Sequence, residues 1–288
     1  MKQLLLPVLA GLVMSCAQSV AQSQEDTERI SREFSLPGGA AASTLVIYNI
    51  HGFIKVDGTT GDKVTFEVDK RITAKNKEEL ATGKRELKLQ FEQKGDTIMA
   101  YIAEPFDSRP NRLNRDNRNN QHLEYDFTLD FTVKVPRQMN IRVSTINRGD
   151  VTVQDVAGAL RVRNVNGAIA LTNVRGATDA HTVNGNVDIN YLASPPDESS
   201  YYTLNGNIRV NYPANLSADL QFKTFQGEFY TDFPDAEILP AQVTKNEERR
   251  GDKTVYKLSR TTAIRLGNGG KVFRFETFNG NVYIKKQS

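Results

Sequence analysis

Residues 149–191 read GDVTVQDVA GALRVRNVN GAIALTNVR GATDAHTVN GNVDINY, grouped here in nines so that every group begins with glycine. Within each full group the third, fifth and eighth positions are apolar, and Thr178 is the one exception. The glycines that open the groups are Gly149, Gly158, Gly167, Gly176 and Gly185. A fixed period of this kind is typical of proteins that stack similar structural units.

Each nine-residue unit combines the pattern of a strand with that of a corner. Apolar residues two and four positions after glycine alternate with other residues, which is the mark of a half-buried strand. Glycine suits a corner because positive φ or a tight bend costs it no steric penalty. We therefore expect Gly167 and Gly185 to have backbone torsions that other residues resist.

The corners are of two kinds, which sets the size of the structural repeat. Gly167 and Gly185 follow asparagine, in the pair Asn-Gly that favours tight turns, whereas Gly158 and Gly176 follow Ala157 and Arg175. Because alternate corners resemble each other, we predict that two units, with two strands, make one 18-residue coil. Further corners of the same type are predicted at Gly206, Gly227 and Gly280.

A single unit is too small to fold alone. Three buried aliphatic side chains contribute roughly 1.5–3 kcal/mol each, whereas ordering nine residues costs about 1–2 kcal/mol apiece. Units must therefore stack around a shared apolar interior. We predict an all-β fold, a β-solenoid or β-helix-like stack of 18-residue coils with a small α+β insertion. An antiparallel meander is the alternative, because Asn-Gly pairs also form hairpins.

The 18-residue coil predicts which residues are neighbours on adjacent coils. Arg161 and Asp179 occupy the same slot, so they should pair on one outer face. Three further residues form the predicted column on the opposite face, and two asparagines should stack at one edge. These residues are Thr152, Ala170 and Asp188 for the column, and Asn166 and Asn184 for the edge.

The composition suits one large all-β domain or two small ones. The chain has 288 residues, no tryptophan and a hydrophobic share of 39%. Lys and Arg total 37 against 34 Asp and Glu, a net charge of +3. This small excess gives no bulk electrostatic reason to expect nucleic acid as a partner.

The N-terminus has the pattern of an export signal, which we place at residues 1–21. Lys2 precedes an apolar run from Leu4 to Met14 that is too short to span a bilayer. Small residues before Gln22 suit ordinary signal peptidase, whereas the residues before Cys16 resemble a lipoprotein box. Cys16 is the only cysteine, so no disulfide forms within the mature chain. We predict a periplasmic, outer-membrane-surface or secreted protein, whose only membrane attachment would be a lipid anchor on Cys16 under the second of these two cleavage patterns.

The rest of the chain divides into a leading segment and one β-repeat domain. Residues 22–44 hold a polar, flexible stretch over 22–31 and a first strand from Arg32. Residues 45–286 form the domain, with a helix-bearing insertion at 70–122 and a hairpin insertion at 234–272. Within the first insertion, Lys75–Arg85 has the composition of a short helix, and two strands around Lys94-Gly95-Asp96 form a hairpin.

The order of these parts resembles the bacterial "putative adhesin" β-repeat family, a domain of unknown function from envelope proteins. The resemblance rests on the export signal, the insertion, the strand ending VKVPRQMNIRVST and the run NVNGAIALTNVRGATDAHTVNGNVDIN. It covers nearly all of residues 32–286 and implies a surface-binding role without agreed catalytic residues. One departure is an extra residue in the corner Thr145–Gly149.

Motifs for catalysis, cofactors and metals are absent from the sequence. The three histidines, His51, His122 and His181, have no second ligand at metal spacing. Calcium-binding nonapeptide rolls need an aspartate in each turn, and the aspartates here do not recur in one register. Glycoside hydrolysis needs two carboxylates about 5–10 Å apart, but outward positions of residues 149–191 carry scattered Asp and no Glu. We expect no enzyme activity, no cofactor and no metal.

One basic segment could contact an anionic partner. Its arginines fall three apart, with Asn and Asp between them, and are Arg109, Arg112, Arg115 and Arg118. A helix would place them on one face, although Pro110 and the surrounding asparagines favour a solvated loop.

The pattern as a whole predicts an exported cell-envelope protein with a binding or structural, adhesin-like role. The expected partner is an envelope protein or a glycan that the sequence does not name. Two alternatives remain open: a carbohydrate-active enzyme built on a β-helix, and a regulatory envelope module that binds another protein.

We predict that the mature chain begins at Gln22 or at a lipidated Cys16. Intact-mass analysis of the protein from native membranes and from periplasm distinguishes the two forms. Full-length, unprocessed protein in the cytoplasm would contradict both.

Overall fold

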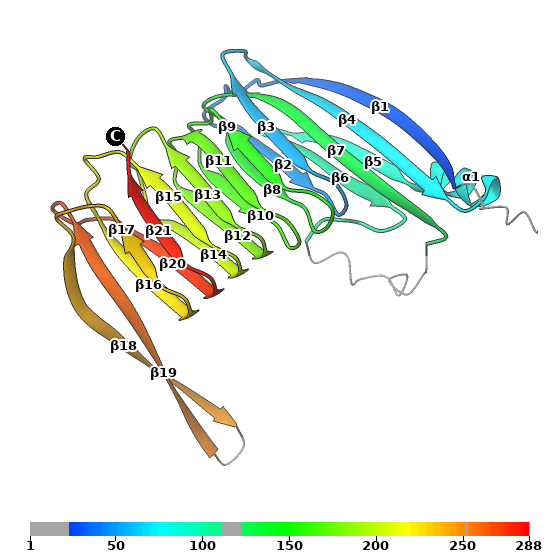
Figure 1. Ribbon diagram of the computed structural model, residues 1–288. Coiled ribbons are helices and arrows are strands. Elements are labelled where there is room, and N and C mark those ends of the chain that lie inside the picture. Colours follow the sequence, from blue (N-terminus) through cyan, green and yellow to red (C-terminus); the bar gives the residue numbers. More distant parts are fainter. Residues whose placement is uncertain (1–22, 111–122, 251–252, 288) are drawn as a thin grey trace, which may run out of the picture.

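The computed structural model describes residues 23–110, 123–250 and 253–287, with the backbone alone for 241–250 and 253–261. These residues form two large sheets and one helix, α1 (Lys77–Glu86) (Figure 1). Sheet A contains, in spatial order, β1 (Gln24–Ser35), β4 (Lys63–Ala74), β7 (Tyr125–Pro136), β3 (Ile54–Thr59), β9 (Val151–Gln154), β11 (Ile169–Val174), β13 (Val187–Tyr191), β15 (Ile208–Tyr212), β21 (Val282–Lys286) and β17 (Phe229–Thr231). Sheet B contains β18 (Glu237–Arg250), β19 (Lys253–Leu266), β16 (Ala218–Gln226), β20 (Val272–Asn279), β14 (Ser199–Asn205), β12 (Thr178–Asn184), β10 (Leu160–Arg163), β8 (Asn140–Ser144), β2 (Thr44–Tyr48), β6 (Thr97–Glu104) and β5 (Lys88–Lys94).

The predicted all-β class is confirmed, and it takes the form of two mixed, open sheets. Successive strands from β8 to β15 alternate between sheet B and sheet A, and each pairs in parallel with strands of its own sheet. The antiparallel meander is therefore wrong for this region. Antiparallel pairs occur only toward the ends of the described sheets, such as β1 with β4 and β18 with β19.

The predicted 18-residue offset is confirmed over β9 to β13. Arg161 pairs with Asp179 in the β10–β12 register. On the other sheet Thr152, Ala170 and Asp188 pair in one column. Because the strands are parallel and in register, side chains at the same slot of successive coils lie next to each other on the same face.

The apolar core lies between the two sheets. Val162 is 0% exposed and Leu171 is 1% exposed, as the alternation predicts, whereas Asp188 is half-buried on the outer face. Near the C-terminal strands the core changes from aliphatic to aromatic. Tyr201 stacks on Phe275 at 4.8 Å between ring centroids, and Tyr212 stacks on Phe273 at 5.6 Å. Tyr201 and Phe275 occupy paired positions of the adjacent strands β14 and β20, whereas Tyr212 of sheet A and Phe273 of sheet B stack across the core.

The N-terminal segment differs from the prediction. Residues 22–31 were expected to be flexible, but β1 pairs with β4 from Gln24 to Ser35. Its stability comes from backbone hydrogen bonds and exposed ion pairs, including Lys63 to Glu33 at 2.7 Å and Lys70 to Glu28 at 3.2 Å. Each exposed pair is worth only about 0–1 kcal/mol, and Ile30 and Phe34 also pack against the core. These two are the only apolar residues of β1, so its sequence shows little apolar alternation.

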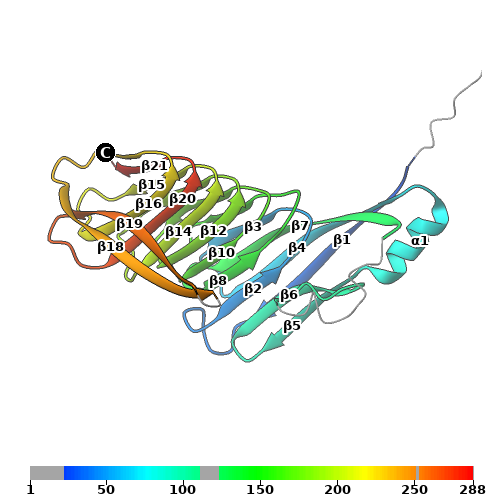
Figure 2. The same ribbon diagram turned by 90° about the horizontal axis from the view of Figure 1, so that it is seen from below.

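The segment between β4 and β7 carries the helix and hairpin that its composition predicts. The Asn76 side chain accepts a hydrogen bond from the Glu79 amide at 2.9 Å, and the Glu79 carboxylate accepts one from the Lys75 amide at 3.1 Å. This reciprocal arrangement caps the N-terminus of α1. β5 and β6 form the antiparallel hairpin beside β2. Figures 1 and 2 place α1 and this hairpin at the same end of the molecule.

The strands at the other end do not follow sequence order. β20 lies between β14 and β16, and β21 lies between β15 and β17, although β16 and β17 come first in the chain. The intervening residues form the β18–β19 hairpin, which projects from this end in Figure 1.

The repeat positions require glycine because a Cβ atom would clash with the neighbouring main chain, and not because φ is positive. Gly167 and Gly185 do not have positive φ, so the predicted torsional reason is wrong. A Cβ atom at Gly167 would lie 2.3 Å from Gly149 O, and one at Gly185 would lie 2.3 Å from Gly167 O. At Gly176 the distance to Gly158 O would be 1.8 Å. Successive corners therefore pack main chain on main chain.

Replacing Gly176 with alanine should lower the free energy of unfolding by about 1–3 kcal/mol, the usual cost of overpacking. Gly61→Ala is the matched control, because its Cβ would meet nothing closer than Thr59 Oγ1 at 3.4 Å. The control should change stability by less than about 0.5 kcal/mol. Urea titrations measure both, and equal effects would show that corner contact is not what demands glycine.

Candidate functional site

The outer face of sheet B carries a cluster of charged side chains on three adjacent strands of the repeat region. On β8, β10 and β12, Arg142, Arg161 and Asp179 pair in one register column. Ser144, Arg163 and His181 form the column two residues further along the same strands. Figure 2 shows these strands side by side in sheet B. Since residues two apart on a strand share a face, both columns point outward.

Asp179 is the centre of a hydrogen-bonded network on this face. Its carboxylate accepts hydrogen bonds from Ser200 Oγ at 2.8 Å and from Arg163 Nη2, and it lies 2.9 Å from His181 Nε2. Partial burial raises the pKa of Asp179, but hydrogen bonds from His181, Arg163 and Ser200 outweigh it and hold the pKa well below its ordinary value. Asp179 is therefore an anchored carboxylate that holds its neighbours in place.

The arginines of this face are unequally neutralised. Arg163 donates both to the Asp179 carboxylate and, at 2.9 Å, to its main-chain carbonyl. Arg161 lies 3.5 Å from the same carboxylate. Arg142 pairs in register with Arg161 on one side and with Val46 on the other. Within the described residues Arg142 has no ion-pair partner, so positive charge exceeds negative charge here.

A cavity opens beside these arginines, and we call it the basic groove. Its volume is 460 Å³, and its lining residues are Tyr48, Pro110, Arg142, Val143, Ser144, Arg161 and Arg163. Pro110 belongs to a segment that folds back after β6. Ser108, which is 7% exposed, holds that segment by donating to Tyr48 O at 2.7 Å and accepting from the Ile102 amide at 2.9 Å.

Of the four arginines predicted to form a basic contact segment, only Arg109 is described. It is paired with Asp107 at 2.6 Å, and its guanidinium lies 4.0 Å from the Tyr101 ring centroid. Arg112, Arg115 and Arg118 lie outside the described residues, as do Cys16, His122 and the predicted signal at 1–21. Sequence analysis missed Arg142 and Arg163 as site residues. The sequence pattern could have revealed them, because both occupy outward-facing positions of strands and align with polar residues on the neighbouring strands.

A second set of side chains forms a ladder along the corners. Amide hydrogen bonds of 2.7–2.8 Å join asparagines of adjacent strands, and the predicted contact between Asn166 and Asn184 is confirmed. The ladder consists of Asn147, Asn166, Asn184, Asn205 and Asn279. The extra residue predicted in the first corner is Arg148, whose φ of 61° lets Asn147 keep its place in the ladder. Gly167, Gly185, Gly206 and Gly280 each follow a ladder asparagine, whereas Gly158 and Gly176 lie at the other corners, which lead from sheet A to sheet B.

The C-terminal end of the stack exposes aromatic rings. Phe225 stacks on Phe278 at 4.6 Å between centroids, and these side chains belong to residues that are 71% and 43% exposed. Tyr230 stacks on Tyr283 at 5.0 Å on the other side of the Gly227 corner. These rings continue the internal columns onto the surface.

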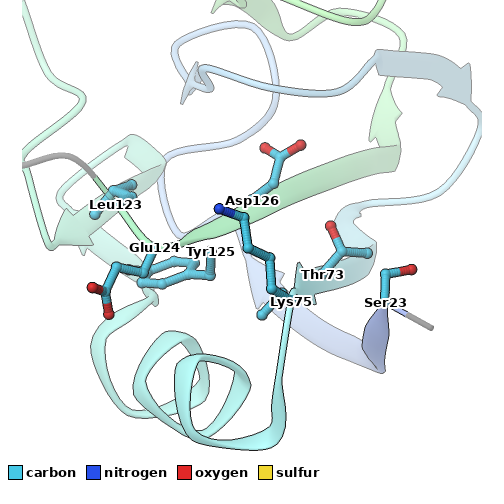
Figure 3. Close-up of a pocket in the computed structure, with 8 residues that line it drawn as sticks. Ser23, Thr73, Lys75, Leu123, Glu124, Tyr125 and Asp126 are labelled. Carbon is cyan, nitrogen blue, oxygen red and sulfur yellow. The ribbon is translucent and has the colours of Figure 1, made fainter. Parts of the chain in front are cut away.

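A further cavity of 400 Å³ lies at the opposite end, beside α1. Figure 3 shows the Lys75 side chain extending across it between Tyr125 and Asp126, while Glu124 and Asp126 extend in different directions. Burial, followed by the charge of Glu86, raises the pKa of Tyr125 to about 12, and its hydroxyl has no hydrogen-bond partner within the described structure. The mixed charges in this cavity do not define a ligand class.

Two structural features commonly tied to function are missing from the described residues. No group of three His, Cys, Asp or Glu side chains could hold a metal ion there. The described ranges also contain no helix with the length and apolar character needed to cross a membrane.

Comparison with known proteins gives low-similarity structural matches. No protein-family model and no curated protein matches the sequence. A "putative cell adhesion protein" from Clostridium sporogenes is 11% identical with a TM-score of 0.43, covering 92% of this chain and 100% of its own. A "putative adhesin" from Bacteroides fragilis is 11% identical with a TM-score of 0.33, and a "putative lipid binding protein" from Parabacteroides distasonis is 12% identical with a TM-score of 0.23. Each of these two covers 90% of this chain and 97% of its own. The scores are low, so these matches assign neither a family nor a ligand.

The stabilising effect of Asp179 should depend on pH. A carboxyl group whose pKa is depressed on folding stabilises the fold above its unfolded-state pKa, about 3.9 for aspartate, and loses that effect as the pH falls toward its folded-state pKa. The difference in unfolding free energy between wild type and Asp179→Asn should therefore shrink from pH 7 to pH 2 in urea titrations.

Asp188→Asn is the control, because Asp188 makes one exposed ion pair, with Arg209 at 3.1 Å. Its difference from wild type should change less over the same range. If the Asp179→Asn difference stays constant with pH, Asp179 is not held ionised by its neighbours.

Proposed function

We propose that this chain is an exported cell-envelope protein of the adhesin-like β-repeat type, with a binding role and no catalytic activity. Its architecture is best described as a β-solenoid, with one strand of sheet B and one of sheet A in each 18-residue coil. The parallel 18-residue register from β9 to β13 supports that description. Export rests on the sequence of residues 1–21, and the periplasm, the outer-membrane surface and the medium are all compatible with it.

The observation that carries the binding role is the basic groove. Its volume lies within the range of about 300–1,000 Å³ typical of small-ligand sites. It combines the surfaces of the Tyr48 ring and Pro110 with convergent polar groups from the arginines and Ser144, while Val143 points into the core. Most of the side chains that line it come from regular strands, which hold a site more firmly than free loops.

The part of the groove that the structure describes gives no support to the alternative of a carbohydrate-active enzyme. Hydrolysis of a glycoside needs two facing carboxylates, and the lining residues that the structure describes include none. The nearest carboxylate in its network, Asp179, is engaged by Arg163, Ser200 and His181 and remains ionised. It cannot serve as a general acid near neutral pH, because its proton is already lost.

A protein partner is a second candidate, favoured by the exposed rings at the C-terminal end. Aromatic side chains are enriched in the centres of protein interfaces. Phe225 and Phe278 present such a surface, at a distance along sheet B from the basic groove. A regulatory module would bind its partner through this end.

The test is a glycan and envelope-protein binding array probed with the mature chain, residues 22–288. The groove-filling variant Ser144→Trp should lose at least tenfold in affinity for the captured ligand. Gln221→Trp is the matched control, since Gln221 also faces outward on sheet B, but β20, β14 and β12 separate its strand from β10 and the groove. This control should bind as wild type does.

Three other outcomes would change the assignment. Failure to bind any component of the array would overturn the binding role. Release of cleaved glycan, detected by mass spectrometry, would establish the enzyme alternative. Capture of an envelope protein that is lost in Phe225→Ser and kept in Ser144→Trp would move the binding surface to the aromatic end.

A further inference from the structure

The basic groove holds two neighbouring positive charges that the described acidic residues only partly neutralise. Arg142 and Arg161 are directly opposite each other on the adjacent parallel strands β8 and β10. Like charges in this position destabilise a sheet. Asp179 lies on the far side of Arg161 and forms ion pairs with Arg161 and Arg163, so it does not neutralise Arg142. Val46, on the remaining side of Arg142, is apolar and equally unable to compensate.

The same arrangement is well suited to an anion. Guanidinium groups are planar forks that bind carboxylate and phosphate oxygens in pairs. Arg161 is anchored through Asp179, whereas Arg142 is exposed and has no ion-pair partner in the described structure. Ser144, two residues after Arg142 and on the same face, adds a hydroxyl that can donate to an oxygen. An oxyanion between the two arginines would convert repulsion into two charge-assisted contacts.

The rest of the cavity has room for more than a bare ion. At 460 Å³ it holds a compact organic body in addition to the charged group. The Tyr48 ring and Pro110 supply surfaces for that body, and Tyr48 keeps a polar tip. The ligand should therefore be a small molecule, or the end of a larger one, with one oxyanion and one ring-sized body.

We propose that the basic groove binds the oxyanion of a sugar acid or sugar phosphate, held between Arg142 and Arg161 with Ser144 as an additional donor. This assignment rests on the proposed binding function and specifies its ligand class. Asp179 acts as a positioning residue, because it orients Arg161 and Arg163 without facing the ligand. A carboxylate and a phosphate present the same chemistry to the two arginines, and the two sources are separated by experiment.

Isothermal titration calorimetry of the mature chain tests this assignment with three probes: D-glucuronate, glucose 1-phosphate and neutral glucose. At low ionic strength at least one anionic sugar should bind tenfold or more tightly than glucose, and added salt should weaken that binding. Preference for glucuronate or for glucose 1-phosphate identifies the source of the oxyanion.

The variants Arg142→Gln and Arg161→Gln should each reduce affinity for the anionic sugar at least tenfold. Arg274→Gln is the matched control: Arg274 occupies the same register column of sheet B, three strands from Arg161, and is neutralised by Glu198 at 2.7 Å. It should bind as wild type does. Without ligand, Arg142→Gln should melt no lower than wild type, because it removes one of two repelling charges.

Equal affinity for glucose and both anions would overturn the assignment, as would unchanged binding in Arg142→Gln. A melting temperature of unliganded Arg142→Gln well below that of wild type would also contradict it, because Arg142 would then be neutralised within the fold. If the array captures a ligand through the groove while no anionic sugar binds, the binding function stands and this ligand class is wrong. If the array captures nothing, the binding function itself has failed.

Discussion

Main-chain contact between successive corners is the constraint on which the rest of the structure depends. A carbonyl oxygen from one corner occupies the space where a side chain of the next would begin, as at Gly176 above Gly158. Because the corners touch, the strands between them lie at ordinary sheet spacing and keep one register. That register aligns the asparagine ladder on the edge, the apolar columns inside and the charged columns outside. The positions of these surface side chains therefore depend on the strand spacing and register that the corners fix.

The periodic part of the fold could be predicted because its causes are local. Alternation and glycine spacing were enough to pair Arg161 with Asp179 and to place Leu171 inside. Only the end of β1, from Arg32, could be recognised, since Ile30 and Phe34 are its only apolar residues and leave little alternation. The order β14–β20–β16 could not be recognised either. The corner sequences at Gly227 and Gly280 are nearly the same, so they do not indicate which of the two strands lies next to β14. Arg142 and Arg163 become a site only once three strands are in register.

The groove illustrates how a regular scaffold produces an irregular surface. Parallel strands repeat the same slot at every coil, so an outward slot filled by arginine twice in succession concentrates charge that a single strand could not. One carboxylate, Asp179, balances part of that charge and fixes two of the side chains. The segment anchored by Ser108 then adds a wall through Pro110, which turns a flat face into a cavity. A cavity lined by arginines thus arises from a few side chains on a regular framework.

The position of β20 and β21 within the stack has a consequence for how the chain folds. During synthesis β16 and β17 emerge first and meet the open edges of β14 and β15, where nothing yet occupies the native place of β20 and β21. The phrases Thr224–Gly227 and Thr277–Gly280 differ at one position, so both rungs fit that edge. In the native order, β20 and β21 must insert between strands that were synthesised before them. We therefore expect this end to fold slowly and to allow incorrect strand pairing as an intermediate. The strands from β8 to β15 join their sheets in sequence order, so none of them has to insert between earlier strands.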